Sequence, residues 1–200
     1  MKSKVEIYPM KDTLVQKSDK EKLTNHKGMV FWMFGLSGSG KSTLARALER
    51  KLYNDGVFCK VLDGDNIRSG ISNNLDFGIE GRDENNRRVA EVSKLFIENG
   101  TVVICSLISP MIEIRENAKD IIGSENFREV YINTSFEECA RRDTKGLYKK
   151  ALSGEIQYFT GYTAPFQEPT DPFLVIDTEN ETIDDCLELL YDQVKKEIKL

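Results

Sequence analysis

Residues 35–42 read Gly-Leu-Ser-Gly-Ser-Gly-Lys-Ser, the pattern of a loop that wraps phosphate groups. Glycines let the backbone curl so that successive N–H groups point at phosphate oxygens, and a helix beginning near Ser42 adds its positive end. Lys41 should reach the β and γ phosphates of ATP, and the Ser42 hydroxyl should bind Mg²⁺. The predicted cofactor site therefore consists of Gly35, Leu36, Ser37, Gly38, Ser39, Gly40, Lys41, Ser42 and Thr43.

Two carboxylates, Asp63 and Asp65, follow the second apolar run of the chain. Ligands of open α/β sheets bind at the carboxyl ends of the strands, so both side chains can face the γ phosphate. One carboxylate could orient or deprotonate an acceptor hydroxyl, and one could hold the metal's water shell. A second interpretation makes Asp65 the N-cap of a helix, which is compatible with the first. The phosphate loop alone does not separate a kinase from a nucleotide switch, and these carboxylates favour the kinase.

The elements that position these residues alternate between apolar runs and helical patterns. Each apolar run is apolar on both faces, which is typical of a parallel sheet covered by helices on both sides. We therefore predict an α/β fold of the P-loop kinase type, with a five-stranded parallel sheet and helices on both faces. The strands are predicted at residues 29–34, 58–62, 101–105, 128–132 and 173–176, and the helices at 42–53, 83–99, 112–122, 136–142 and 182–198.

The chain is predicted to form one domain, residues 29–200, preceded by an extension. Residues 1–28 are polar and rich in lysine, with a short helix at 18–24 that Ser18 or Asp19 would cap. Residues 143–172 carry glycine, proline, lysine and aromatics without clean periodicity. A connection of that length is usually functional, and we interpret it as a lid.

Charge and cysteine content exclude several classes of protein. A net charge of −5 argues against nucleic acid as a partner, because binding the phosphate backbone needs clustered Lys and Arg. Four dispersed cysteines and a single histidine support neither a zinc site nor a disulfide framework. No apolar run approaches the roughly 20 residues that span a bilayer. A cytoplasmic protein with reduced thiols and no membrane partner is expected.

Several segments together resemble the adenylyl-sulfate kinase family. They are residues 35–43, 62–68, 85, 87–92, 108–110, 142–143, 145–151, 154–156 and 159–161, and the likeness runs from about Trp32 to Thr178. The phosphate loop is generic. The segments Asp-Gly-Asp-Asn-Ile-Arg at 63–68 and Lys-Gly-Leu-Tyr-Lys-Lys-Ala at 145–151 are specific to that family.

The resemblance implies transfer of the ATP γ-phosphoryl group to the ribose 3′-hydroxyl of adenylyl sulfate, by a homodimer. It implies that Asp65 is the acceptor-orienting acid and Asp63 the second carboxylate. Arginine forks suit sulfate and phosphate oxygens, and aromatic rings stack on bases. The acceptor-binding residues that it implies are Arg68, Phe77, Arg82, Asn85, Ile108, Ser109, Lys145 and Phe159, with the base held between the two phenylalanines.

Simpler interpretations exist for some of these residues. Phe77 and Phe159 could be core aromatics, and Arg68 or Arg82 could be partners in surface ion pairs. The resemblance also implies a phosphoserine intermediate at Ser109 in bacterial members, whereas direct in-line transfer from ATP is physically simpler. Ser109 is therefore a predicted catalytic residue whose role is open.

Departures from the family pattern cluster around the acceptor. They lie at Asp76, Gly78, Gly81, Leu107, Met111, Gln157 and Tyr158. These changes are either neutral or adapt the pocket to another activated nucleotide, such as cytidine diphosphoramidate, which is the second enzyme hypothesis. A nucleotide-binding module without catalysis is the third, and the intact Lys41, Ser42, Asp63 and Asp65 argue against it.

Overall fold

The computed structural model of the chain describes residues 9–10 and 13–200 and contains a five-stranded parallel sheet. The strand order is β2-β3-β1-β4-β5, and every paired strand is parallel to its neighbour. The predicted α/β fold is confirmed. The strands are β1 (Val30–Phe34), β2 (Cys59–Asp63), β3 (Val102–Leu107), β4 (Phe127–Asn133) and β5 (Leu174–Asp177).

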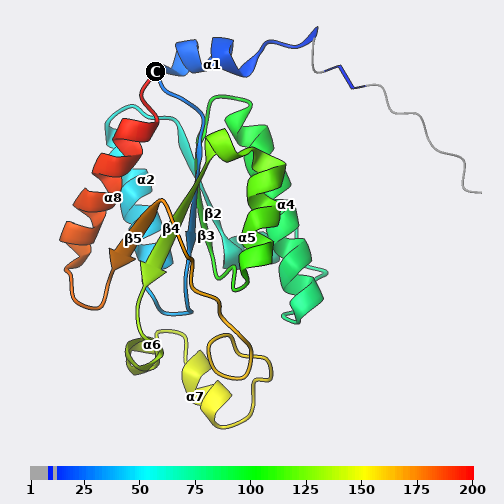
Figure 1. The fold of residues 1–200 in the computed structure, drawn as a ribbon, viewed down its shortest axis with the longest axis vertical. Coiled ribbons are helices and arrows are strands. Elements are labelled where there is room, and N and C mark those ends of the chain that lie inside the picture. The colour runs from blue at the N-terminus through cyan, green and yellow to red at the C-terminus, as the bar shows by residue number, and fades with distance from the viewer. Residues whose placement is uncertain (1–8, 11–12) are drawn as a thin grey trace, which may run out of the picture.

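Helices cover both faces of the sheet (Figure 1). Helices α2 (Lys41–Asn54) and α8 (Ile183–Glu197) cover one face, and α4 (Ile79–Ile97) and α5 (Ile112–Ile122) cover the other. The predicted helix at 112–122 has the observed bounds. Helix α4 begins four residues earlier than the predicted 83, at Ile79, where apolar periodicity is weak.

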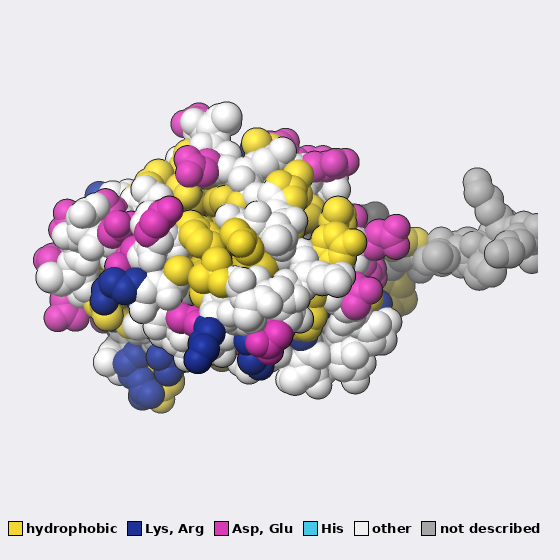
Figure 2. Space-filling model, turned by 90° about the horizontal axis from the view of Figure 1, so that it is seen from below, with side chains coloured by type: hydrophobic (Ala, Val, Ile, Leu, Met, Phe, Trp, Pro, Cys, Tyr) yellow, Lys and Arg dark blue, Asp and Glu magenta, His cyan; other side chains and the backbone are white. Residues whose placement is uncertain are grey.

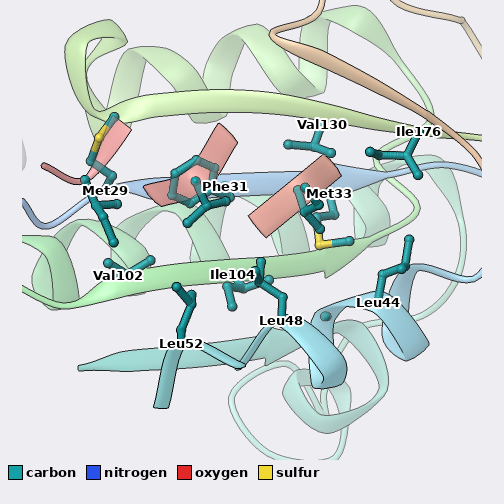
Figure 3. Close-up of a cluster of buried hydrophobic side chains, with 14 of the residues drawn as sticks. Met29, Phe31, Met33, Leu44, Leu48, Leu52, Val102, Ile104, Val130 and Ile176 are labelled. Carbon is teal, nitrogen blue, oxygen red and sulfur yellow. The ribbon is translucent and has the colours of Figure 1, made fainter. Parts of the chain in front are cut away.

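The central strand β1 is buried at all five positions, because it has a strand on each side and a helix layer on each face. Its side chains alternate between two cores. Phe31 and Met33 pack against Leu44 and Leu48 of α2, as Figure 3 shows, while Trp32 packs in the core under α4 and α5. This burial fixes the carboxyl end of β1, from which the phosphate loop departs.

The edge strands correct one expectation. We predicted strands buried on both faces, but Lys60 in β2 and Val175 in β5 are exposed. Each edge strand has a neighbour on one side only and lies at the margin of the helix layers. The apolar runs predicted the strands correctly, but the two edge strands are less buried than we predicted.

Short helices account for most of the other differences. Helix α6 (Phe136–Arg142) has the predicted bounds, but α3 (Gly64–Arg68), α7 (Leu147–Leu152) and the 3₁₀ turn η2 (Ser124–Asn126) were not predicted. Each of these elements is six residues or shorter, which is too short to show helical periodicity. Helix α7 lies within the segment 143–172, which shows no clean periodicity in the sequence.

Helix α1 (Lys17–Thr24) precedes the sheet, and its N-cap is Gln16 rather than the predicted Ser18 or Asp19. The Glu21 carboxylate accepts a hydrogen bond of 2.8 Å from the backbone N–H of Gly28, and the Lys20 ammonium donates to the carbonyl of Glu98. In Figure 1, α1 lies at the end of the molecule opposite α6 and α7. Part of the predicted extension, residues 1–8 and 11–12, lies outside the described residues.

Candidate active site

The phosphate loop connects β1 to α2 and depends on glycines at its two ends. Gly35 has φ 153°, and a Cβ atom there would lie 2.5 Å from the carbonyl oxygen of Ile132 in β4. Gly40 has φ 97° and is the N-cap of α2. A side chain would be strained at both positions. The loop therefore lies tightly against β4 and directs the first turn of α2 at the space above it.

Lys41 is buried, with 7% of its surface exposed, and its ammonium group donates to its own loop. The acceptors are the carbonyl oxygens of Gly35 at 2.9 Å and Leu36 at 2.6 Å, and the Ser39 hydroxyl at 3.3 Å. Burial lowers the pKa of Lys41 to about 8. A lysine whose charged form is destabilised by burial is typical of an anion-binding site.

Ser42 and Asp63 form the oxygen-rich part of the site. The Ser42 hydroxyl donates to Asp63 Oδ2 at 2.7 Å, and the backbone N–H of Asp65 donates to Asp63 Oδ1 at 3.1 Å. Asp63, not Asp65, is thus the N-cap of α3, which corrects the simpler interpretation of Asp65. One carboxylate therefore orients the Ser42 hydroxyl and also begins the short helix that carries Asp65.

One cavity of about 770 Å³ brings most predicted site residues together. Gly35, Leu36 and Ser39 are buried and do not line it. The predicted site residues that line it are Ser37, Gly38, Gly40, Lys41, Ser42, Thr43, Asp63, Asp65, Arg68, Phe77, Arg82, Asn85, Ile108, Ser109, Lys145 and Phe159.

Arg68 and Arg82 hold one wall of this cavity, the segment around Phe77. Arg68 Nη1 donates to the carbonyl of Asp76 at 2.8 Å, and Arg82 Nε donates to the carbonyl of Phe77 at 2.8 Å. Neither guanidinium forms one of the described ion pairs, so the surface ion-pair interpretation is wrong for the described residues. Burial lowers the pKa of both arginines, and for Arg82 the charge of Arg68 adds to the effect. Two adjacent cations favour an anionic ligand.

The two predicted stacking residues differ in environment. Phe77 is 63% exposed, with the Arg68 guanidinium 4.5 Å from its ring centroid, so it is not a core aromatic. Phe159 is buried and contacts Tyr148 edge-on, with 4.8 Å between ring centroids. Both line the cavity, and Phe159 also belongs to a small apolar cluster with Leu36 and Tyr148.

Ser109 is 1% exposed, and its hydroxyl has two partners. It accepts from the indole N–H of Trp32 at 2.9 Å and donates to Asn86 Oδ1 at 2.6 Å. Its φ of 40° is unusual for a residue with a side chain, and Arg115 donates to its carbonyl at 2.9 Å. The surrounding contacts therefore hold both the backbone and the hydroxyl of Ser109 in place.

Segment 143–172 contacts the phosphate loop and the carboxylates. The Tyr148 hydroxyl donates to the carbonyl of Ser37 at 2.7 Å, and Lys145 forms an ion pair with Asp65. Just before the segment, Arg142 donates to the carbonyl of Thr178 at 2.6 Å. Lys145 and Asp65 are 80 positions apart in the sequence, and only the fold brings them together.

Sequence reasoning missed several lining residues, among them Asn86, Ser106, Thr144, Glu155 and Thr160. Ser106 is in β3, whereas the predicted strand ended one residue earlier, at Cys105. Its position at the carboxyl end of that strand was the signal that could have identified it.

A second cavity, of about 720 Å³, lies between the ends of β4 and β5 and residues 161–168. Among the described residues that line it, Leu36 is the one predicted site residue, so we place the chemistry in the other cavity.

Figure 2 views the molecule from the end at which α6 and α7 lie. Hydrophobic side chains gather near the middle of that face, with acidic side chains to the left and above and Lys and Arg at the lower left.

Two searches of the described residues gave negative results. Within 9–10 and 13–200, no helix is long and apolar enough to cross a membrane. In the same part of the chain, no group of three or more His, Cys, Asp or Glu side chains could hold a metal ion. All four cysteines are free thiols.

Comparisons with known proteins cover nearly the whole chain. The family model described as Adenylylsulphate kinase matches residues 27–177. An adenylyl-sulfate kinase of Bacteroides thetaiotaomicron is 50% identical over 199 residues, which cover 100% of this chain and 99% of that protein. Every predicted site residue falls within the matched region.

Two solved structures extend the comparison. The structure of the Mycobacterium tuberculosis APS kinase CysC in complex with AMPPNP and APS has a TM-score of 0.81 and 40% identity, and covers 84% of this chain and 98% of that one. A hexameric APS kinase from Thiobacillus denitrificans has a TM-score of 0.66 and 28% identity, and covers 87% of this chain and 30% of that one.

Proposed function

The chain belongs to the adenylylsulphate kinase family, and from this premise we propose how its residues carry out the reaction. The enzyme transfers the γ-phosphoryl group of ATP to the ribose 3′-hydroxyl of adenylyl sulfate, which gives ADP and 3′-phosphoadenylyl sulfate. The observation that carries the proposal is the single cavity that joins the phosphate loop, two carboxylates, two arginines and two phenylalanines.

On the donor side, the backbone N–H groups of residues 35–42 bind the phosphates. Lys41 leaves the carbonyls of Gly35 and Leu36 and contacts the β and γ phosphates, where its charge offsets the charge that develops during transfer. Hydroxyl and carboxylate oxygens are ligands that suit Mg²⁺, so Ser42 and Asp63 fit this ion directly or through its waters. When bound, Mg²⁺ neutralises phosphate charge.

On the acceptor side, Asp65 accepts the proton of the 3′-hydroxyl while the 3′-oxygen bonds to the γ-phosphorus and the bond to the leaving ADP oxygen breaks. Its ion pair with Lys145 supports a role for Lys145 in orienting this carboxylate. Arg68, Arg82 and Asn85 bind the phosphosulfate group. The charge and partial burial of the two arginines support this assignment, as does the position of Asn85 in the same cavity lining.

Phe77 and Phe159 hold the acceptor base between them, and Ile108 completes this wall of the cavity. Ser109 supports the pocket, since its hydroxyl accepts from the indole of Trp32 and donates to Asn86. Direct in-line transfer from ATP needs no phosphoserine and is the physically simpler course.

We assign residues 29–200 to one kinase domain, residues 1–28 to an extension and residues 143–172 to a lid. The contacts of Lys145 and Tyr148 with the site support the lid. We further propose a cytoplasmic homodimer. The free thiols are consistent with a reducing compartment, and the hexameric relative supports self-association in this family.

Steady-state kinetics with adenylyl sulfate varied at saturating ATP and Mg²⁺ test the reaction. We expect one ADP per 3′-phosphorylated product, and a fall in kcat of about 10²- to 10⁴-fold in Asp65→Asn with unchanged ATP affinity. Asp83→Asn, which lies on the exposed side of α4, is the matched control. Phosphorylation of a cytidine diphosphate derivative but not of adenylyl sulfate would overturn the acceptor assignment. Full activity in Asp65→Asn would remove Asp65 from the mechanism.

A further inference from the structure

Ser106 lies next to Ser42 on the donor side, in β3 and one residue beyond the strand predicted at 101–105. It is 3% exposed and lines the active-site cavity. In the parallel pairing of β3 it is in register with Asp63 of β2 and with Met33 of β1, so it stands between the two strands that carry the carboxylate and the phosphate loop. Its hydroxyl oxygen lies 3.2 Å from that of Ser42.

The direction of the hydrogen bonds around Ser42 follows from its chemistry. A hydroxyl group has one donor and two acceptor sites. The single proton of Ser42 goes to Asp63 Oδ2 at 2.7 Å, so the proton between Ser42 and Ser106 must come from Ser106. Ser42 is therefore held from two sides, and one acceptor site of its oxygen is left for another ligand.

We propose that Ser106 is a positioning residue for the Mg²⁺ of the ATP complex and acts through Ser42. By donating to the Ser42 oxygen, Ser106 holds that hydroxyl so that its remaining acceptor site faces the metal. Residues behind a metal ligand commonly tune affinity in this way. This inference rests on the proposed use of Mg²⁺ and ATP, and it does not depend on the identity of the acceptor.

A direct test measures the metal's contribution to ATP binding, without any acceptor and so without turnover. The dissociation constant of ATP is determined by calorimetry in excess Mg²⁺ and again in EDTA, for the wild type and for Ser106→Ala. We expect the ratio of the two constants to fall by about 3- to 10-fold in Ser106→Ala, the loss of one hydrogen bond. The constant in EDTA should not change, because the loop backbone is untouched.

Two further variants separate positioning from general packing. Ser93→Ala removes another buried serine hydroxyl, which contacts Cys105 of the same strand and does not line the cavity among the described residues. Its ratio should equal that of the wild type. Ser106→Thr retains a hydroxyl and should recover most of the wild-type ratio, which also shows that the position tolerates change.

Three outcomes would overturn the proposal: a wild-type ratio in Ser106→Ala, an equal loss in Ser93→Ala, or no effect of Mg²⁺ on ATP affinity in the wild type. Failure of the acceptor assignment is a separate result. In that case adenylyl sulfate would not be phosphorylated, while the Mg²⁺-dependent difference between the wild type and Ser106→Ala would persist.

Discussion

Lys41 is a buried cation at the residue scale of the site. Its ammonium is buried against two loop carbonyls, and its pKa falls to about 8. Below that pH, Lys41 is charged in both the folded and the unfolded chain, so burying the charge lowers the free energy of unfolding by its full amount. Between pH 8 and 10.5, the unfolded chain binds more protons, so this cost is relieved as the pH rises.

We therefore predict a pH-dependent difference between the wild type and Lys41→Met. From pH 8 to 10.5, the free energy of unfolding of the wild type should rise relative to that of the variant by about 2–4 kcal/mol. Urea unfolding at several pH values, without added nucleotide, measures the difference. A constant difference across this range would mean that the Lys41 cation is not destabilised by burial.

Phe77 offers a cleaner test of base stacking than Phe159. Phe159 is part of a buried cluster, so its removal would also disturb packing, whereas Phe77 is mostly exposed. Phe77→Ala should weaken adenylyl sulfate binding by about 1–3 kcal/mol, or about 5- to 150-fold, and leave ATP binding unchanged. Phe58→Ala, at an exposed position outside the cavity lining among described residues, is the control.

Acceptor affinities from equilibrium titration decide this prediction. Equal effects of Phe77→Ala on ATP and on acceptor would place the ring outside the acceptor pocket. An effect in Phe58→Ala as large as that in Phe77→Ala would indicate a general loss of structure.

Part of the site could be predicted from sequence at the residue scale, because the chemistry of the phosphate loop is encoded in consecutive residues. The hydrogen-bond and ion-pair partners of the other site residues are not encoded in consecutive residues. Ser109 meets Trp32 across 77 positions, and Lys145 meets Asp65 across 80. Arg68 was predicted to hold ligand, and its hydrogen bonds to backbone carbonyls are visible only after folding.

At the scale of elements, the carboxylate of Asp143 stabilises the start of segment 143–172. Asp143 follows α6 with φ 26°, and its two oxygens accept from the backbone N–H groups of Tyr148 and Lys149 in α7. Desolvation acts to raise the pKa of Asp143, but these N–H donors outweigh it and hold the pKa below its usual value. The N-cap of α7 is Gly146, and Asp143 supplies from outside the helix the side-chain acceptors for two N–H groups of its first turn.

Asp143→Ala should loosen α7 without unfolding the protein. Loss of a capping side chain costs about 1 kcal/mol, so hydrogen exchange at Tyr148 and Lys149 should become faster while the strands keep their protection. Exchange followed by mass spectrometry measures this. Asp171→Ala, in the exposed part of the same segment, should leave α7 unchanged. Slower or unchanged exchange in Asp143→Ala would exclude this role of Asp143.

The length of an element decides whether apolar periodicity in the sequence can predict it. Strands and helices of ordinary length were found from apolar spacing, because each buries a continuous face. Helix α3 depends on the side chain of Asp63, and α7 on that of Asp143. Such short helices depend on one or two hydrogen bonds from backbone N–H groups to a preceding carboxylate, which the apolar pattern of the sequence does not display.

At the scale of the whole molecule, the two ends of the parallel sheet have different tasks. The carboxyl ends of the strands carry the active-site cavity, and α1 packs at the opposite end (Figure 1). Glu21 is buried there between the Gly28 N–H and the Lys17 ammonium, which lies 2.8 Å away. Stability contributed at this end should be independent of catalysis.

Glu21→Ala should therefore lower the free energy of unfolding by about 1–3 kcal/mol, because the buried Gly28 N–H loses its acceptor. The kcat and the KM for ATP should remain those of the wild type. Denaturant unfolding and steady-state assays on the same samples measure both. Lys22→Ala, an exposed change on the same helix, should affect neither quantity. A large fall in kcat in folded Glu21→Ala would show that the two ends are coupled.

The hydrogen bond between Trp32 and Ser109 has an optical consequence. Trp32 is the single tryptophan of the chain and is fully buried, so its emission should be shifted to the blue. Its indole N–H donates to the hydroxyl of Ser109, a buried residue in the lining of the proposed acceptor pocket. Any event that moves Ser109, whether acceptor binding or covalent modification, changes the polarity around the indole. The protein therefore carries an intrinsic fluorophore for its acceptor pocket, and stopped-flow fluorescence can follow that pocket without a label.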